Sequence, residues 1–224
     1  ADNYLEKKYE EYKSRKEGRT NHPYNGRKTT VIHKTRRVFV TGGAEGIGKA
    51  IVRAFRSAGH RVAFCDRNEA AGKETALQTG TSFFHVDVSD QEALENCMQQ
   101  IFKEWGDIDI IINNAGISCF SPITETGVED FDRILSVNLR PVFITSRRLA
   151  IHRQSQEAPN PFGRIVNICS TRYLMSEPGS EGYAASKGGI YSLTHALALS
   201  LARDARLRTA SPRRSRPTSV GASR

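Results

Sequence analysis

Short apolar runs alternate with helix-length stretches over most of the chain, and this pattern limits the available folds more than any other feature. The apolar runs are VFVTG (38–42), RVAFCD (61–66), SFFHVDV (82–88), IDIIINNAG (108–116) and GRIVNICS (163–170). The stretches between them include 47–58, 90–105, 128–152 and 183–203. Strands that alternate with helices pair in parallel through right-handed crossovers, which leave helices on both faces of one sheet. The sequence therefore predicts an α/β fold with a doubly wound parallel sheet, formed as a single domain by residues 37–205.

The two ends of the chain differ from this central region in composition. Residues 1–36 are polar and basic, and YLEKKYEEYKSRKE within them fits a solvated helix. Residues 206–224 are rich in arginine, serine and proline, and such a segment buries too little apolar surface to order itself. The net charge of +9 comes mainly from these ends, because the central region is mildly acidic. Basic tails are more often solvated than bound to polyanions, so a nucleic-acid partner is not expected.

The sequence contains no sign of a membrane or secretory protein. It has no run of about 18 apolar residues, and it does not open with a charged and then an apolar segment. The cysteines are Cys65, Cys97, Cys119 and Cys169, and they form no C-x-x-C pair. This spacing favours free thiols in a reducing cytosol over a disulfide framework or a metal site. We therefore expect a cytoplasmic protein without a structural metal.

The run TGGAEGIG (41–48) directly follows the first predicted strand and opens the first predicted helix. In such a loop Gly42 permits the tight turn, Gly46 lets the backbone approach a pyrophosphate, and Gly48 lets the helix pack close to the strand. Ile47 lies between the last two glycines and is counted with this loop. The free N–H groups of the helix then face the phosphates. A plain turn also favours glycine, but strand, spacing and helix together favour dinucleotide binding.

Asp66 ends the second predicted strand, about 20 residues beyond the glycine loop. A carboxylate at this place accepts hydrogen bonds from an adenosine ribose and repels a 2′-phosphate. Glu45, inside the glycine loop, adds a second negative charge, and Arg67 partly offsets both. These charges favour NAD over NADP as the cofactor. Considered alone, Asp66 also fits a turn residue at the end of a strand.

The chain resembles the short-chain dehydrogenase/reductase family over about 37–205. The motifs that carry the resemblance are TGGAEGIG (41–48), HVDVSD (85–90), NNAG (113–116), ICS (168–170) and YAASK (183–187). Members of that family have a Rossmann-like sheet in the order 3-2-1-4-5-6-7. They move a hydride between a nicotinamide cofactor and a carbonyl or alcohol carbon of a small molecule. The resemblance implies the same fold, cofactor class and reaction here.

The resemblance also implies roles for residues at two further strand ends. Asp87 and Val88 would hold the adenine. Asn114, Ala115 and Gly116 would border the ribose while they brace the central strand. The alternative for the asparagines of NNAG is that they mainly bond to neighbouring backbone, and both roles are compatible.

Tyr183 and Lys187 are four residues apart, so on a helix they share one face. A free tyrosine has a pKa near 10 and is a poor base at neutral pH, but a nearby ammonium favours its phenolate. By the family resemblance, Tyr183 would take the proton of the alcohol during oxidation and return it during reduction. Lys187 would also reach the nicotinamide ribose, and Tyr183 is counted with it among the residues that bind the cofactor. The alternative is a surface pair without a chemical role.

Two more residues complete the implied catalytic set. Ser170 would hydrogen-bond the substrate oxygen and orient it. Asn138, in ILSVNLRPVF, would kink a helix and hold a water molecule that links Lys187 to solvent. The set implied by the resemblance is therefore Asn138, Ser170, Tyr183 and Lys187.

The resemblance ends with the helix that carries Tyr183. Family members usually continue with a sixth strand that ends in a Pro-Gly turn, a helical lid and a seventh strand. Here TASPRRSRPTSVGASR (209–224) follows, and Ser211-Pro212 precedes an arginine where glycine is expected. We therefore expect the last two strands and the lid to be absent. A truncated or frame-shifted coding sequence is favoured over a natural short form with a basic tail.

Loss of the sixth strand would have two physical consequences. Arg164–Cys169 would become a bare apolar edge of the sheet. The nicotinamide half of the site would be open to water, which weakens the alignment of the reacting groups. We therefore expect weak or unmeasurable turnover from this chain unless another chain covers the edge.

Two functions of different classes remain open at this stage. The leading one is a cytoplasmic, NAD-dependent oxidoreductase that acts on a small-molecule alcohol or carbonyl substrate. By the family resemblance it would form a homodimer or homotetramer through helices near 128–152 and 183–203. The alternative is a non-catalytic dinucleotide-binding or interaction protein that uses its basic ends as contacts. The sequence does not identify the substrate.

Overall fold

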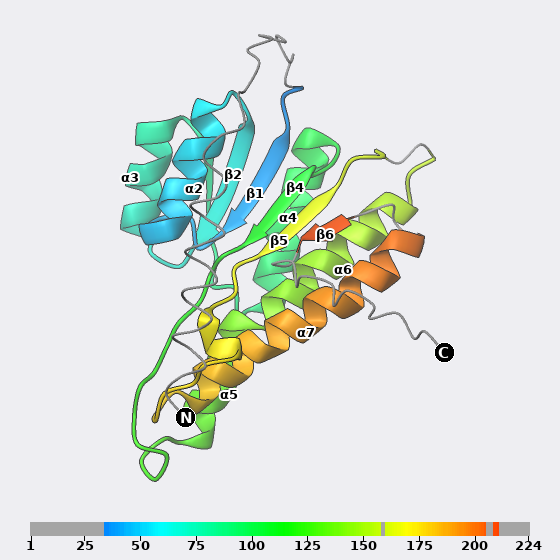
Figure 1. Cartoon of the computed structure of the whole chain (residues 1–224). Coiled ribbons are helices and arrows are strands. Elements are labelled where there is room, and N and C mark those ends of the chain that lie inside the picture. Colours follow the sequence, from blue (N-terminus) through cyan, green and yellow to red (C-terminus); the bar gives the residue numbers. More distant parts are fainter. Residues whose placement is uncertain (1–33, 158–159, 205–207, 211–224) are drawn as a thin grey trace, which may run out of the picture. The chain divides into compact units, whose positions relative to one another are not determined.

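The computed structural model describes residues 34–157, 160–204 and 208–210, and the polar segments at 1–33 and 211–224 lie outside the described residues. The strands form one sheet in the order β3-β2-β1-β4-β5-β6, and every pair is parallel (Figure 1). The strands are β1 Arg37–Thr41, β2 Arg61–Asp66, β3 Ser82–His85, β4 Ile110–Asn113, β5 Arg164–Asn167 and β6 Arg208–Ala210.

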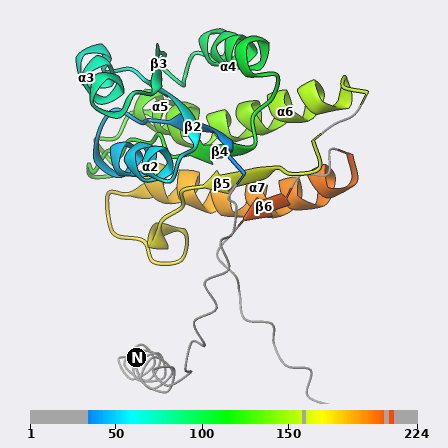
Figure 2. The ribbon, with the colours of Figure 1, turned by 90° about the horizontal axis from the view of Figure 1, so that it is seen from above.

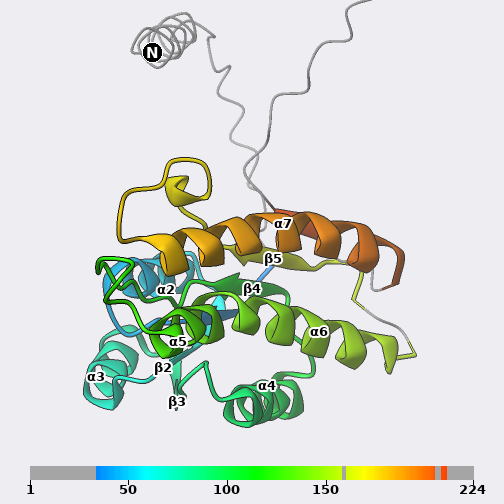
Figure 3. The ribbon, with the colours of Figure 1, turned by 90° about the horizontal axis from the view of Figure 1, so that it is seen from below.

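Helices connect these strands and cover both faces of the sheet. They are α2 Gly46–Ser57, α3 Glu69–Thr79, α4 Gln91–Trp105, α5 Val128–Asn138, α6 Arg140–Gln154 and α7 Glu181–Asp204, with a short 3-10 helix η1 at Thr171–Tyr173. The helix predicted at 128–152 is in fact divided at Leu139 into α5 and α6. Figure 1 shows α2 and α3 side by side on one side of the sheet. Figure 2 shows α6 and α7 running alongside each other, and Figure 3 shows α4, α6 and α7 side by side.

Alternation of side chains along β1 explains the two layers of helices. Val38 and Val40 belong to the same buried cluster as Val52 of α2. Phe39, between them, belongs to the cluster that contains Ile101 of α4 and other residues of α6 and α7. Because successive side chains of a strand point to opposite faces, one apolar run supplies both cores. The predicted α/β fold with a doubly wound parallel sheet is confirmed.

The edge of β5 differs from the expectation. Residues 208–210 form β6 and pair in parallel with Arg164–Val166, so the prediction that this edge is bare was wrong for these residues. Backbone hydrogen bonds form a strand whatever the side chains are, and a segment of three polar or small residues gives no hydropathic signal. The described residues contain no seventh strand and no lid after α7.

A buried ion-pair network lies where β4 begins. The Asp109 carboxylate is 3% exposed and accepts hydrogen bonds from Arg37 Nε at 3.0 Å and Arg37 N at 2.8 Å. Arg153 of α6 is 1% exposed, and its Nη2 donates to the carbonyl oxygen of Ile108 at 2.7 Å. Asp107 bonds to both guanidinium groups. These contacts fix β1, β4 and α6 to one another at the amino-terminal ends of the strands. The glycine loop lies at the opposite, carboxyl ends.

No helix in the described part of the chain is both long enough and apolar enough to cross a lipid bilayer.

Candidate functional site

The glycine loop joins β1 to α2 and leaves no room for side chains where the two elements meet. A Cβ atom added to Gly48 would lie 1.8 Å from the carbonyl oxygen of Gly42, and one added to Gly42 would lie 2.8 Å from the Cα of Ala115. Gly42 and Gly46 also have positive φ angles of 67° and 52°, which disfavour other residues. A Cβ on Gly46 would meet nothing within 4 Å, so this part of the loop borders open space.

We expect the substitution Gly48→Ala to weaken NAD⁺ binding at least about tenfold, which corresponds to roughly 1.4 kcal/mol. The new methyl group must push the Gly42 carbonyl and with it the whole loop, and overpacking of this kind costs about 1–3 kcal/mol. Calorimetric titration with NAD⁺ measures the effect. Gly188→Ala is the matched control, because its Cβ would meet nothing within 4 Å. Equal Kd values for Gly48→Ala and the unaltered protein would contradict the assignment of the loop.

The N-terminus of α2 has no side-chain cap, unlike the next two helices in the chain. Asn68 and Asp90 cap α3 and α4 by accepting hydrogen bonds from Ala71 N and Ala93 N. Glu45, at the same place before α2, makes no such bond. Helix N-termini carry unpaired N–H groups and a partial positive charge, which suit a phosphate. The loop and the helix start therefore fit the pyrophosphate of a dinucleotide.

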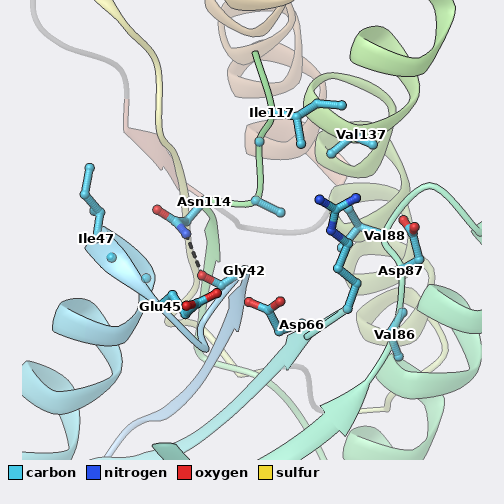
Figure 4. A pocket seen from close by; sticks show the side chains of 15 residues that line it. Gly42, Glu45, Ile47, Asp66, Val86, Asp87, Val88, Asn114, Ile117 and Val137 are labelled. Atoms are coloured by element: carbon cyan, nitrogen blue, oxygen red, sulfur yellow. Dashed lines mark hydrogen bonds between the residues drawn. The ribbon is translucent and has the colours of Figure 1, made fainter. Parts of the chain in front are cut away.

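A cavity of about 400 Å³ opens beside this loop (Figure 4). Ten residues predicted to bind the cofactor line it, namely Gly42, Gly46, Ile47, Gly48, Asp66, Asp87, Val88, Asn114, Ala115 and Gly116. Five further residues complete the lining, namely Glu45, Arg67, Val86, Ile117 and Val137. The charges of Glu45 and Arg67 were visible in the sequence. The sequence did not predict that Ile117 and Val137 line a cavity, because apolar residues beside a motif usually belong to the core.

Asp66 has two hydrogen-bonded backbone partners at the end of β2. Its Oδ2 accepts from Ala44 N at 3.0 Å, and its Oδ1 accepts from Asn68 N at 3.0 Å. Glu45 accepts from the Asn68 side chain at 3.1 Å. The two carboxylates are thus held next to the glycine loop. Asp66 therefore fixes the turn after β2 and also lines the cavity, so the two places that the sequence suggested for it are compatible.

Asp87 lies on the opposite wall of the cavity (Figure 4). Partial burial opposes the ionisation of its carboxyl group. Ser89 opposes this effect by donating its backbone N–H at 2.9 Å and its hydroxyl at 2.7 Å to Oδ1. Arg67 and Arg133 add favourable charge, and the pKa of Asp87 is lowered from its ordinary value. A fixed negative carboxylate therefore faces the part of the cavity beyond β3.

Asn114 braces the glycine loop through its side chain. Its Nδ2 donates to the carbonyl oxygens of Gly42 at 2.9 Å and Thr41 at 3.2 Å. The hydroxyl of Thr41 accepts hydrogen bonds from the backbone N–H groups of Asn114 and Ala115, both at 3.1 Å. The structural role considered for the NNAG asparagines is therefore present. Thr41 contributes to it without having been named in the sequence prediction.

Tyr183 and Lys187 lie on the first turns of α7, with Lys187 Nζ 5.5 Å from the centre of the Tyr183 ring. Lys187 is 5% exposed, and its Nζ donates to the carbonyl oxygen of Ile168 at 2.9 Å. Burial lowers the pKa of Lys187 from its ordinary value, while the neighbouring Cys169 opposes the shift. The pair is therefore not a solvated surface pair, because its ammonium group is inside the protein.

Asn138 is the last residue of α5, directly before the division at Leu139. It is 2% exposed, and its Oδ1 accepts from Ile117 N at 2.8 Å while its Nδ2 donates to Ile117 O at 2.9 Å. The same Nδ2 reaches the hydroxyl of Ser186 on α7 at 3.0 Å. Asn138 thus ties the NNAG loop to the turn of helix that carries Lys187.

Ser170 follows β5 and accepts a hydrogen bond from Arg172 N at 3.3 Å at the start of η1. The preceding Cys169 donates its thiol to the Lys187 carbonyl oxygen at 3.3 Å, so this strand end is fixed against α7. The four predicted catalytic residues do not line the 400 Å³ cavity. Gly116 joins the two groups, because a Cβ on it would lie 3.4 Å from Asn138 Oδ1 and 3.7 Å from Lys187 Nζ.

Comparisons with known proteins agree with this geometry. A family model described as short chain dehydrogenase matches residues 36–212. The chain is 32% identical to the sorbitol dehydrogenase of Cereibacter sphaeroides over 166 residues, covering 73% of this chain and 64% of that protein. It is 35% identical to the cyclopentanol dehydrogenase of a Comamonas species over 170 residues, covering 74% and 66%. An apo SCOR enzyme from Clostridium thermocellum, 39% identical, superposes with a TM-score of 0.68 over 76% of this chain and 69% of that one.

The chain therefore spans about two thirds of the length of these curated relatives. The matched region contains β1 to β6, the glycine loop and α7. The family model, the identities with its members and the superposition on a solved relative all lead to one conclusion. The chain belongs to the short-chain dehydrogenase/reductase family.

Proposed function

We propose that the chain binds NAD and moves a hydride between its nicotinamide and the carbon of a hydroxyl or carbonyl substrate. The observation that carries this proposal is the junction at Gly116. This glycine lines the nucleotide cavity, and it lies within 4 Å of both Lys187 Nζ and Asn138 Oδ1 when its missing Cβ is added. A cofactor that extended from the cavity past Gly116 would come close to Asn138 and Lys187.

The cavity residues fit the nucleotide half of this cofactor. The uncapped α2 suits the pyrophosphate, and Asp66 suits the adenosine ribose. When bound, the cofactor supplies the hydride acceptor or donor. Tyr183 takes or returns the proton of the substrate oxygen, and Ser170 donates a hydrogen bond that orients that oxygen. The buried ammonium of Lys187 stabilises negative charge on the phenol oxygen and binds the second ribose.

Asn138 holds Lys187 in place indirectly. Its amide bonds to Ile117 and Ser186 connect the strand end after β4 with the turn of α7 that precedes Lys187. Lys187 Nζ has one bond to Ile168 O, so its remaining N–H groups can serve the ribose and a water molecule. We include in this proposal the water molecule that the sequence analysis predicted beside Asn138, which would link Lys187 to solvent.

The charges of the cavity favour NAD over NADP, and the substitution Asp66→Ser tests this. We expect the ratio of the Kd for NADP⁺ to the Kd for NAD⁺ to fall about tenfold or more. The change removes the carboxylate that repels a 2′-phosphate and leaves Arg67 in the cavity wall to bind it. Calorimetric titration with both cofactors measures the ratio without any need for turnover.

Glu104→Gln is the control for this experiment, because it removes one negative charge from the exposed end of α4, outside the cavity. It should leave both Kd values unchanged. An unchanged ratio in Asp66→Ser, with the fold intact by circular dichroism, would mean that Asp66 does not select the cofactor.

A second candidate is a dinucleotide-binding protein without turnover. It is favoured by the position of the 400 Å³ cavity, which lies on the nucleotide side and is not lined by Tyr183. NADH formation from NAD⁺ and a secondary alcohol separates the two candidates. Binding of NAD⁺ without any alcohol-dependent NADH would favour the second one.

A further inference from the structure

We propose that the substrate of this site is an apolar secondary alcohol or its ketone rather than a polyol, and that Phe120 selects it by contact with its carbon skeleton. This inference rests on the proposed function, because it concerns the substrate of the same site. It follows from four exposed apolar residues on the β4–α5 and β5–α7 loops, which we call the apolar rim. They are Phe120, Ile123, Leu174 and Met175.

Two loops carry the apolar rim, and both leave the carboxyl edge of the sheet (Figure 1). The first runs from β4 to α5, and the second runs from β5 to α7. Ser121 N in the first donates to Gly179 O in the second at 3.2 Å. Gly179 has a φ of 74°, and a Cβ on it would lie 2.9 Å from Ser121 O. The two loops are therefore packed directly against each other.

Phe120 is the residue of the rim that reaches the predicted proton donor. Its ring centre lies 6.4 Å from that of Tyr183, at an interplanar angle of 45°. Yet 59% of Phe120 is exposed, so most of the ring has no protein partner in the described chain. A large aromatic side chain that touches a catalytic residue and is otherwise open is suited to contact the substrate.

The loop that carries Phe120 is held by its own hydrogen bonds. The Thr126 hydroxyl donates to Ser121 O at 3.3 Å and to Pro122 O at 3.1 Å, and Glu125 N donates to Pro122 O at 2.9 Å. These bonds form a compact turn immediately after Phe120. The ring is therefore presented from a defined backbone position.

The charged side chains of the second loop are already paired with each other. Arg172 forms an ion pair with Glu177 and donates to Met175 O at 3.3 Å. The Ser180 hydroxyl donates to Glu177 O. A polyol loses hydrogen bonds to water on binding and needs several polar partners in return, whereas an apolar skeleton gains from leaving water. The rim offers apolar surface, so an apolar skeleton is favoured.

The kinetic test compares cyclohexanol with sorbitol as substrates at saturating NAD⁺. We expect kcat/KM to be at least about tenfold higher for cyclohexanol, and Phe120→Ala to lower that value by about 10–200-fold. Phe120→Leu, which keeps an apolar side chain, should retain most of it. Leu77→Ala on α3 removes another exposed apolar side chain, which is 87% exposed. This control should leave kcat/KM unchanged for both substrates. A preference for sorbitol that survives Phe120→Ala would overturn the inference while the proposed function stands.

A binding test does not depend on turnover. Saturation-transfer NMR on Tyr183→Phe with NAD⁺ should show cyclohexanol bound and sorbitol free. Adding Phe120→Ala to that variant should abolish the cyclohexanol signal. If the unaltered protein oxidises no alcohol, the proposed function fails, and Phe120-dependent binding of cyclohexanol then supports only a binding site for apolar molecules at the rim. If cyclohexanol does not bind, or binds equally well without Phe120, the inference is wrong.

Discussion

Replacing Tyr183 with phenylalanine is expected to lower the kcat for alcohol oxidation by about 10²–10⁴-fold, the range that a positioned proton acceptor contributes. The substitution removes only the hydroxyl group, so the ring can keep its contact with Phe120 and its place 5.5 Å from Lys187 Nζ. Tyr183 does not line the nucleotide cavity. The Kd for NAD⁺ should therefore change by less than about twofold. NADH formation and calorimetric titration measure the two quantities.

Tyr191→Phe is the matched control for this prediction. It removes a tyrosine hydroxyl from the same helix, and its ring is stacked on Tyr173 with the ring centres 4.5 Å apart. We expect its kcat to equal that of the unaltered protein. Turnover that survives Tyr183→Phe unchanged would exclude Tyr183 as the proton donor and acceptor.

Replacing Asp109 with asparagine is expected to lower the free energy of unfolding by about 3–5 kcal/mol, as removal of one partner of a buried ion pair does. Asp109 is 3% exposed, and Arg37 donates to it through Nε, Nη2 and the backbone N–H group. Asparagine keeps the shape but leaves the guanidinium of Arg37 with less compensating charge. Urea denaturation at neutral pH, followed by circular dichroism, measures the loss.

Asp132→Asn removes an exposed carboxylate from α5 and is the control for Asp109. It should change the free energy of unfolding by less than about 0.5 kcal/mol. A loss below about 1 kcal/mol in Asp109→Asn would show that the network adds little to stability.

The same carboxylate predicts how stability depends on pH. Burial opposes its ionisation, but the hydrogen bonds and charge of Arg37 prevail and lower the pKa of Asp109 from its ordinary value. A carboxyl group whose pKa is lower in the folded than in the unfolded state stabilises the fold above its ordinary pKa, near 4. That contribution is lost as the pH falls through the folded-state value. When the pH falls below about 4, the free energy of unfolding should therefore decrease less in Asp109→Asn than in the unaltered protein.

Local spacing in the sequence determined much of the site. The four-residue separation of Tyr183 and Lys187 places both on one face of α7, because the helical period is fixed. The glycines at 42, 46 and 48 follow a strand and open a helix. Gly42 and Gly46 have positive φ angles, and close contacts at Gly42 and Gly48 exclude larger residues. The alternation of apolar runs likewise predicted the parallel sheet and its two layers of helices.

Only the tertiary structure decided which segments meet across the sheet. Residues 208–210 pair with β5 through backbone hydrogen bonds, which a polar composition does not reveal. Ile117 and Val137 become cavity walls, and Ile168 O becomes the partner of Lys187, because separate crossovers bring their strand ends and helices together. Helical period and strand alternation act over a few residues and can be read from sequence. Contacts between distant segments depend on how whole elements pack, and their geometry is fixed only when the core is assembled.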